Sequence, residues 1–158
     1  MPFYPKISTL PYTSVIAESD DTRNNTTTLA DDAELTITVV PGTYIVDALI
    51  YFQSTSPTDS SAKVAWSTPA STTGNWTMAA LSSTATATTA TVCLQRYTWG
   101  GTSNGVSVID NNPITCIVHG RLVVANAGNL TLRWAQQSAV AIDTKRLANS
   151  EIRLVQVA

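Results

Sequence analysis

Apolar residues recur at every second position in several short segments of this 158-residue chain. The segment GNLTLRWAQQ (128–137) places Leu130, Leu132 and Trp134 on one side of the chain and polar or small residues on the other. ELTITVV (34–40) alternates in the same way. A period of two is typical of a β-strand with one buried face, because successive side chains of a strand point to opposite sides.

Turn-rich loops separate eight or nine segments of this kind, and no segment has the period of a convincing amphipathic helix. Residues 43–53 are apolar nearly throughout, which predicts a central strand buried on both faces. Short strands at this spacing predict an all-β antiparallel sandwich, most simply a jelly roll. The alternation predicts a core that includes Leu35, Ile37, Leu49, Val64, Trp66, Leu130, Leu132, Trp134 and Leu154.

Residues 1–14 differ from the rest of the chain and are expected to form an extended N-terminal arm, followed by a single β domain over 15–158. Prolines in this segment forbid a helix and disrupt strand pairing. An extended segment needs a surface that hides its apolar side chains, either on its own domain or on a neighbour. The arm residues expected at such an interface are Phe3, Tyr4, Ile7, Leu10 and Tyr12.

Composition excludes several classes of function. Charged residues make up 13% of the chain, about half the usual share, and the formal net charge is −2. Such a chain is poorly suited to neutralise phosphates, so we expect no nucleic-acid partner. No apolar stretch is long enough for a membrane span, and MPFYPKISTLPYTS lacks the pattern of a signal peptide. We therefore expect synthesis in a cytoplasm and no membrane association.

Residues that could carry chemistry are few. His119 is the only histidine and stands in an alternating run, so we expect a structural role for it. The acidic pairs Asp20–Asp21 and Asp31–Asp32 are better explained as solvated turn residues than as a calcium site. No catalytic motif is present. We expect no enzyme activity, no cofactor and no metal.

Cysteines and tryptophans each leave alternatives open. Cys93 and Cys116 lie in apolar, strand-like runs, which favours two buried thiols over a disulfide or a two-cysteine metal site. Tryptophans can form a platform on which a carbohydrate stacks, although Trp66 and Trp134 fit a core better. Trp99 stands beside two glycines in a long loop and is the tryptophan that we expect to be exposed.

Three stretches of the chain together resemble a recurrent family of tailed-bacteriophage virion proteins. They are ADDAELTITVVPGTYIVDALIYF (30–52), KVAWSTPASTTGNW (63–76) and AGNLTLRWAQQSAVAIDTKRLANSEIRLVQV (127–157). The likeness spans roughly residues 22–158 with a diffuse middle, and its last thirty residues or so are the most specific. Arg133 stands where the family often has glutamine, and Asn149–Ser150 where it usually has Gly-Ser.

The resemblance implies a jelly-roll module similar to those of tumour necrosis factor and complement C1q, which typically trimerise. It implies a structural virion protein, most simply a decoration or cement protein on the outside of the head, with itself and the major capsid protein or another virion protein as partners. The alternative is a tail-associated or receptor-binding protein that touches a host surface glycan through the Trp99 loop. Arg133 is then expected to face outward, free to meet a neighbouring subunit. The family has no agreed catalytic residues to carry over.

Overall fold

The computed structural model describes residues 12–54, 61–81, 92–103, 105–108 and 112–157, without the side chain of Cys93. Within these ranges all regular secondary structure is β-strand. The strands are β1 (Tyr12–Ile16), β2 (Asp21–Arg23), β3 (Ala30–Val39), β4 (Gly42–Ser54), β5 (Ser61–Ser67), β6 (Thr73–Leu81), β7 (Val92–Thr98), β8 (Val106–Ser107), β9 (Ile114–Val124), β10 (Gly128–Gln136), β11 (Thr144–Arg146) and β12 (Glu151–Gln156).

The pairing of the strands is nested and antiparallel. β1 pairs with β12, β3 with β10, β4 with β9, and β5 with β8. If β1, β3, β4, β5, β8, β9, β10 and β12 are taken in chain order, the first therefore pairs with the last, the second with the last but one, and so on inward. A double-stranded antiparallel ribbon wound into two facing sheets has this topology, which is that of a jelly roll. The predicted fold class is confirmed.

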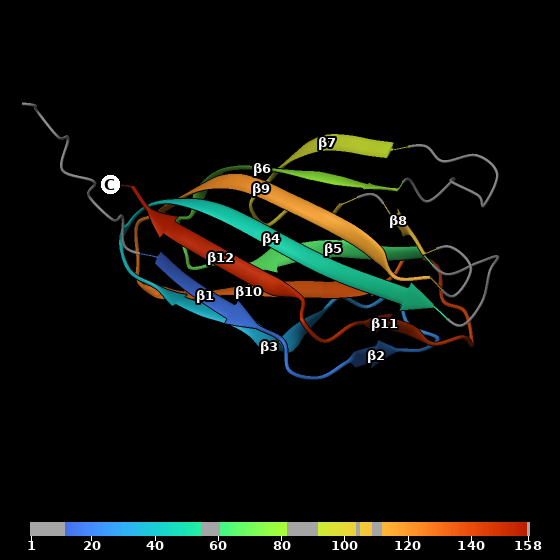
Figure 1. Ribbon diagram of the computed structural model, residues 1–158. Helices are drawn as coiled ribbons and strands as arrows, with labels where there is room; N and C mark the ends of the chain where they lie inside the picture. Colours follow the sequence, from blue (N-terminus) through green and yellow to red (C-terminus); the bar gives the residue numbers. More distant parts are fainter. Residues whose placement is uncertain (1–11, 55–60, 82–91, 104, 109–111, 158) are drawn as a thin grey trace, which may run out of the picture.

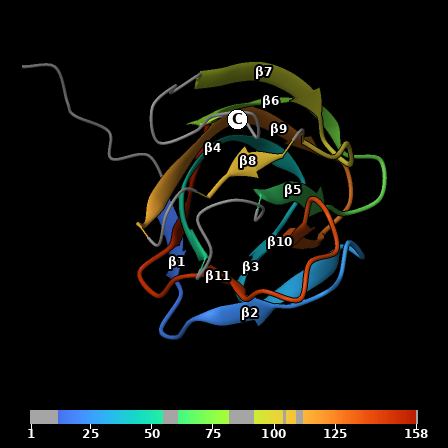
Figure 2. The ribbon, with the colours of Figure 1, turned by 90° about the vertical axis from the view of Figure 1, so that its right-hand side faces the viewer.

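The strands form two sheets of unequal size. The large sheet has the order β1-β12-β4-β9-β6-β7, with β11 paired to one end of β4 and β2 beside β11. The small sheet has the order β3-β10-β5-β8. Figure 1 shows the strands running along the long dimension of the molecule. Figure 2, turned by 90°, shows the two sheets curving around a common interior.

The hydrophobic core lies between the sheets, and only one face of each sheet contributes to it. β4 shows this best, because Val46, Ile50 and Phe52 are buried whereas Asp47 and Leu49 on its other side are exposed. The prediction that residues 43–53 are buried on both faces is therefore wrong, and so is the placement of Leu49 in the core, since its exposed fraction is 39%. The sandwich has two layers, and no third layer among the described residues covers that face. The remaining predicted core residues are buried, as expected: Leu35, Ile37, Val64, Trp66, Leu130, Leu132, Trp134 and Leu154.

The two cysteine-bearing strands do not neighbour each other, because β6 lies between β7 and β9. Two strand spacings separate their backbones by about 9–10 Å, more than the roughly 7 Å that a disulfide spans between Cα atoms. Cys116 is buried in the core, as expected. The burial of the Cys93 side chain lies outside the described residues and stays a prediction.

Candidate interaction surface

The arm residues predicted at an interface fall mostly outside the described residues. This holds for Phe3, Tyr4, Ile7 and Leu10, whose roles stay predictions. Residues 12–14 begin strand β1, in which Tyr12 is opposite Val155 of β12. The Tyr12 ring is exposed on the surface, and the guanidinium carbon of Arg153 lies 5.4 Å from its centroid.

The expectation that Trp99 is exposed is wrong. Its exposed fraction is 9%, and its ring lies 5.8 Å from that of Trp66 and 6.3 Å from that of Trp76. Its indole Nε1 donates a hydrogen bond of 2.7 Å to the carbonyl oxygen of Arg121. The loop after β7 thus turns this side chain inward, where apolar area is buried and the polar atom has an acceptor.

Arg133 lies on the outward side of the small sheet and is bound within its own chain. Its Nε lies 2.9 Å from Oδ1 of Asp31, and its Nη2 donates to the carbonyl oxygen of Leu29 at 3.0 Å. The outward direction agrees with the sequence-based expectation. The guanidinium group, however, is not free for a neighbouring subunit as the resemblance implied.

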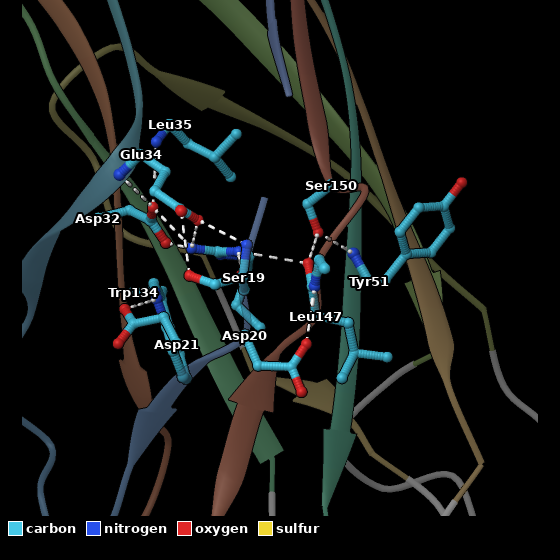
Figure 3. A network of polar contacts seen from close by, with 12 residues as sticks. Ser19, Asp20, Asp21, Asp32, Glu34, Leu35, Tyr51, Trp134, Leu147 and Ser150 are labelled. Carbon is cyan, nitrogen blue, oxygen red and sulfur yellow. Dashed lines mark hydrogen bonds and ion pairs between the residues drawn. The ribbon is translucent and has the colours of Figure 1, made fainter. Parts of the chain in front are cut away.

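A polar cluster around two buried charges, Asp32 and Arg146, joins three distant segments and was not revealed by the sequence; Glu34 is half-buried and Ser19 is exposed. We call Ser19, Asp32, Glu34 and Arg146 the buried clamp; Figure 3 shows Ser19, Asp32 and Glu34 converging on one point. The Arg146 side chain is 1% exposed, and its Nε and Nη2 bind the two carboxylate oxygens of Asp32 at 2.8 and 3.0 Å. Nη2 also reaches Glu34, and Nη1 donates to the carbonyl oxygens of Ser19 and Leu147. Every N–H of the guanidinium therefore has an acceptor.

Asp32 has a second task in the clamp. Its Oδ1 accepts hydrogen bonds of 3.0 Å from the backbone N–H groups of Glu34 and Leu35, at the point where the pairing of β3 with β10 shifts register. The carboxylate thus holds an irregularity in the strand while it neutralises Arg146. Asp32 is fully buried, so its expected role as a solvated turn residue is wrong.

The pKa of the Glu34 carboxyl group is lowered within the clamp. Burial acts to raise the pKa of its carboxyl group, but hydrogen bonds from the Ser19 hydroxyl and backbone N–H, together with Arg146, act the other way. The opposing contributions leave the pKa of Glu34 below its ordinary value. The ionised form is therefore the one that the folded clamp favours.

The outer face of the large sheet points away from the small sheet. In contrast to the clamp, where charged side chains are buried, this face exposes apolar side chains to solvent. Residues in register across six strands form what we call the apolar row, and all but one of them are apolar. Its members are Ile16, Glu151, Leu49, Ile117, Ala79 and Leu94. Four of them are large and exposed to solvent, namely Ile16, Leu49, Ile117 and Leu94.

The adjacent register of the same strands forms a charged row. Its members are Ser14, Arg153, Asp47, His119, Thr77 and Arg96. His119 Nδ1 lies 2.6 Å from Oδ1 of Asp47, so the lone histidine has a carboxylate partner on the surface. Arg153 pairs with Glu151 at 3.1 Å. Charges of both signs therefore border the apolar row.

A shallow groove of about 220 Å³ lies where the two rows meet, and we call it the central groove. Leu49 and Ile117 form its apolar wall, and Asp47, Glu151 and Arg153 supply charge. Apolar contact area bordered by paired charges is typical of a protein-binding surface.

Among the residues that the structure describes, no three histidine, cysteine, aspartate or glutamate side chains gather as a metal site would require. None of the described segments is a helix long and apolar enough to span a membrane.

Sequence reasoning missed the outer face because it assigned the apolar residues of 43–53 to the core. The signal was nonetheless present. Ile45, Leu49 and Tyr51 alternate with the buried residues of the same strand, and Ile117 alternates with Cys116 and Val118 in β9. In a two-layer antiparallel sandwich, a strand that is apolar on both sides must show one of them to the outside.

Comparisons with known proteins agree in fold only. No protein-family model and no curated protein matches the sequence. The chain is similar to Eiger TNF from S. frugiperda, with 13% identity, a TM-score of 0.43 and 94% of each chain covered. It is also similar to chains from infectious bursal disease virus: the Gx strain at 8% identity and a TM-score of 0.24, and the Gt strain at 10% and 0.25. It covers 42% and 46% of those two viral chains, less than half of their length. Nothing about function follows from likenesses at this level.

Proposed function

We propose that this chain is a structural protein of a tailed-bacteriophage virion, which decorates the outside of the head as a homotrimer. Its partners are further copies of itself and the major capsid protein or another virion protein. It acts without catalysis or cofactor, is made in the host cytoplasm and resides on the capsid surface. The resemblance of residues 22–158 to phage virion proteins supplies the setting.

The apolar row on the outer face of the large sheet is the observation that carries an assembly role. Burying a large apolar side chain fully is worth roughly 1.5–3 kcal/mol, so Ile16, Leu49, Ile117 and Leu94 together represent a considerable driving force for association. Contiguous apolar patches of this kind mark interaction surfaces in soluble proteins. A protein that works by packing against other subunits needs such a surface.

The residue on which the alternative of a receptor-binding protein rested, Trp99, is buried. That function depended on an exposed Trp99 onto which a host glycan can stack. Trp99 is instead packed against Trp66 and Trp76. The apolar row suits a protein partner better than a sugar, so we favour the decoration protein.

Copy number on the particle tests the proposed location. Quantitative mass spectrometry of purified particles of the phage that encodes this chain should find hundreds of copies, in a fixed ratio to the major capsid protein. The capsid protein itself serves as the internal standard. A handful of copies would place the chain in the tail, and its absence from particles would refute the proposal altogether.

Light scattering of the purified protein tests the homotrimer independently of any particle. The expected mass is three times that of the 16.8 kDa chain. A species that stays monomeric at high concentration would rule out the trimer while leaving the copy number open.

A further inference from the structure

The two most exposed large apolar side chains of the described residues stand together at one edge of the large sheet. On β7, Leu94 is 74% exposed and Val92 is 65% exposed. Both project on the same side of the strand as the apolar row, since they are two residues apart and Leu94 is its last member. They form an apolar protrusion, which we call the β7 knob.

The central groove offers a complementary depression on the same face. Its volume is about 220 Å³, and Leu49 and Ile117 form its apolar wall. The knob cannot reach the groove of its own chain, because β6 and β9 lie between β7 and β4. Three strand spacings amount to about 14 Å. The knob of a second copy, unlike that of the same chain, can approach the groove from outside the sheet.

The charges around the groove and the spacing of its residues along β4 match those of the β7 knob of a second copy. Arg96 follows Leu94 by two residues on the same side of β7, and Asp47 precedes Leu49 by two residues on the same side of β4. Each pair of side chains is thus separated by about 7 Å along its strand. Arg96 is exposed, and Asp47 is half exposed at the rim of the groove, so the two opposite charges can meet when copies associate.

We propose that copies of this chain associate by inserting the β7 knob of one copy into the central groove of the next, with Arg96 opposite Asp47. This inference rests on the proposed homotrimer and names the contact that builds it. In the proposed ring each copy gives its knob to the next copy and receives a knob from the previous one, so the contact is heterologous. An exchange of knobs between only two copies would be isologous and would stop at a dimer. A two-fold contact of knob with knob would instead leave Leu49 and Ile117 in water.

Disulfide trapping tests the contact directly. A Leu49→Cys/Leu94→Cys variant, in a Cys93→Ser background, should form covalent oligomers up to a closed ring of three on mild oxidation, and reduction should reverse them. Within one chain the two Cα atoms are too far apart for a disulfide, so every crosslink is between copies. The single variants Leu49→Cys and Leu94→Cys are the matched controls and should stay uncrosslinked. Covalent dimers from Leu94→Cys alone would overturn the proposal in favour of a knob-to-knob contact. Crosslinking of the double variant that stops at dimers would overturn the ring in favour of a reciprocal two-fold contact.

Charge exchange provides a second readout. Arg96→Glu and Asp47→Arg should each weaken association by at least about tenfold, because like charges then meet across the contact. The combined variant should return to within a few-fold of the wild type. If the wild type is monomeric, the homotrimer and this contact both fail. If it is trimeric while neither crosslinking nor charge exchange has the expected effect, only the contact is wrong and the groove is occupied in another way. Particle binding is measured separately and does not enter this result.

Discussion

The buried clamp and the outer face of the large sheet invert the usual distribution of side chains. In the clamp, Arg146 and Asp32 carry full charges and are almost completely buried. On the outer face, Leu49, Ile117 and Leu94 are apolar and exposed to solvent. The difference lies in whether partners are present within the chain. Each N–H of Arg146 has an acceptor, whereas the apolar row is covered by no described residue.

The side chains of the clamp find all their partners within one chain, whereas the apolar row exposes side chains that a second molecule can cover. A buried charge is tolerated only when it is paired and hydrogen-bonded, and the clamp meets that condition within the monomer. An exposed apolar row is tolerated in a monomer but gains free energy on association. Changes in the clamp should therefore affect folding, and changes on the outer face should affect assembly.

Arg146→Met should give one of the two largest losses of stability. It leaves the Asp32 carboxylate buried without its counter-charge, for which we expect a cost of about 3–5 kcal/mol in the free energy of unfolding. Urea denaturation monitored by tryptophan fluorescence measures it.

The matched control for this variant is Arg146→Met/Asp32→Asn. Asparagine keeps an oxygen that accepts from the backbone N–H groups of Glu34 and Leu35 but removes the unpaired charge. The double variant should recover part of the lost stability. If it is no more stable than Arg146→Met, lost packing rather than the buried charge explains the effect.

Trp134→Ala and Leu94→Ala compare how much a core residue and an outer-face residue each contribute to the stability of the monomer. Trp134 is fully buried, its ring lies 5.4 Å from that of Phe52, and its Nε1 donates to Asp21 at 3.2 Å. Its truncation should cost about 3–5 kcal/mol, whereas truncation of Leu94 should change the stability of the monomer by only a few tenths. Leu94→Ala should instead weaken self-association. A large loss of monomer stability from Leu94→Ala would show that this face is already covered within one chain.

Acidification should weaken the clamp through Glu34. Because its pKa is lowered in the folded protein, its ionised form contributes stability above the ordinary value of 4.5, and this contribution is lost as the pH falls through the folded-state pKa. Glu34→Gln should be less stable than the wild type at neutral pH, and the gap should narrow below about pH 4.5. Thermal melts across this range test the sign. A gap that widens on acidification contradicts it.

Removal of residues 2–11 should have the smallest effect on stability. This deletion spares β1, which begins at Tyr12. If the arm anchors the protein to a neighbour, the truncated chain should keep its melting temperature and lose binding to the particle. A fall in melting temperature, with binding reduced only in proportion, would mean that the arm packs on its own domain.

The sequence determined the strands and the inward direction of most of them. Period-two alternation placed Leu130, Leu132 and Trp134 correctly in the core, because alternation is a local property of an extended chain. The predicted strands 34–40, 43–53 and 128–137 match β3, β4 and β10 to within four residues at each end. The short strands β2, β8 and β11 were missed, since two or three residues cannot display a period.

Only the tertiary structure decided which side of β4 and β9 faces outward and that the charged side chains of Asp32 and Arg146 are buried as a pair. Both sides of β4 carry large apolar residues, so the local pattern cannot show which of them meets a second layer. Asp32 and Arg146 are 114 residues apart and meet only because β11 pairs with the end of β4. Trp99 likewise turned inward toward Trp66 and Trp76, although its glycine-flanked position had predicted exposure. In each case the deciding contact joins segments far apart in the chain, and no local pattern encodes it.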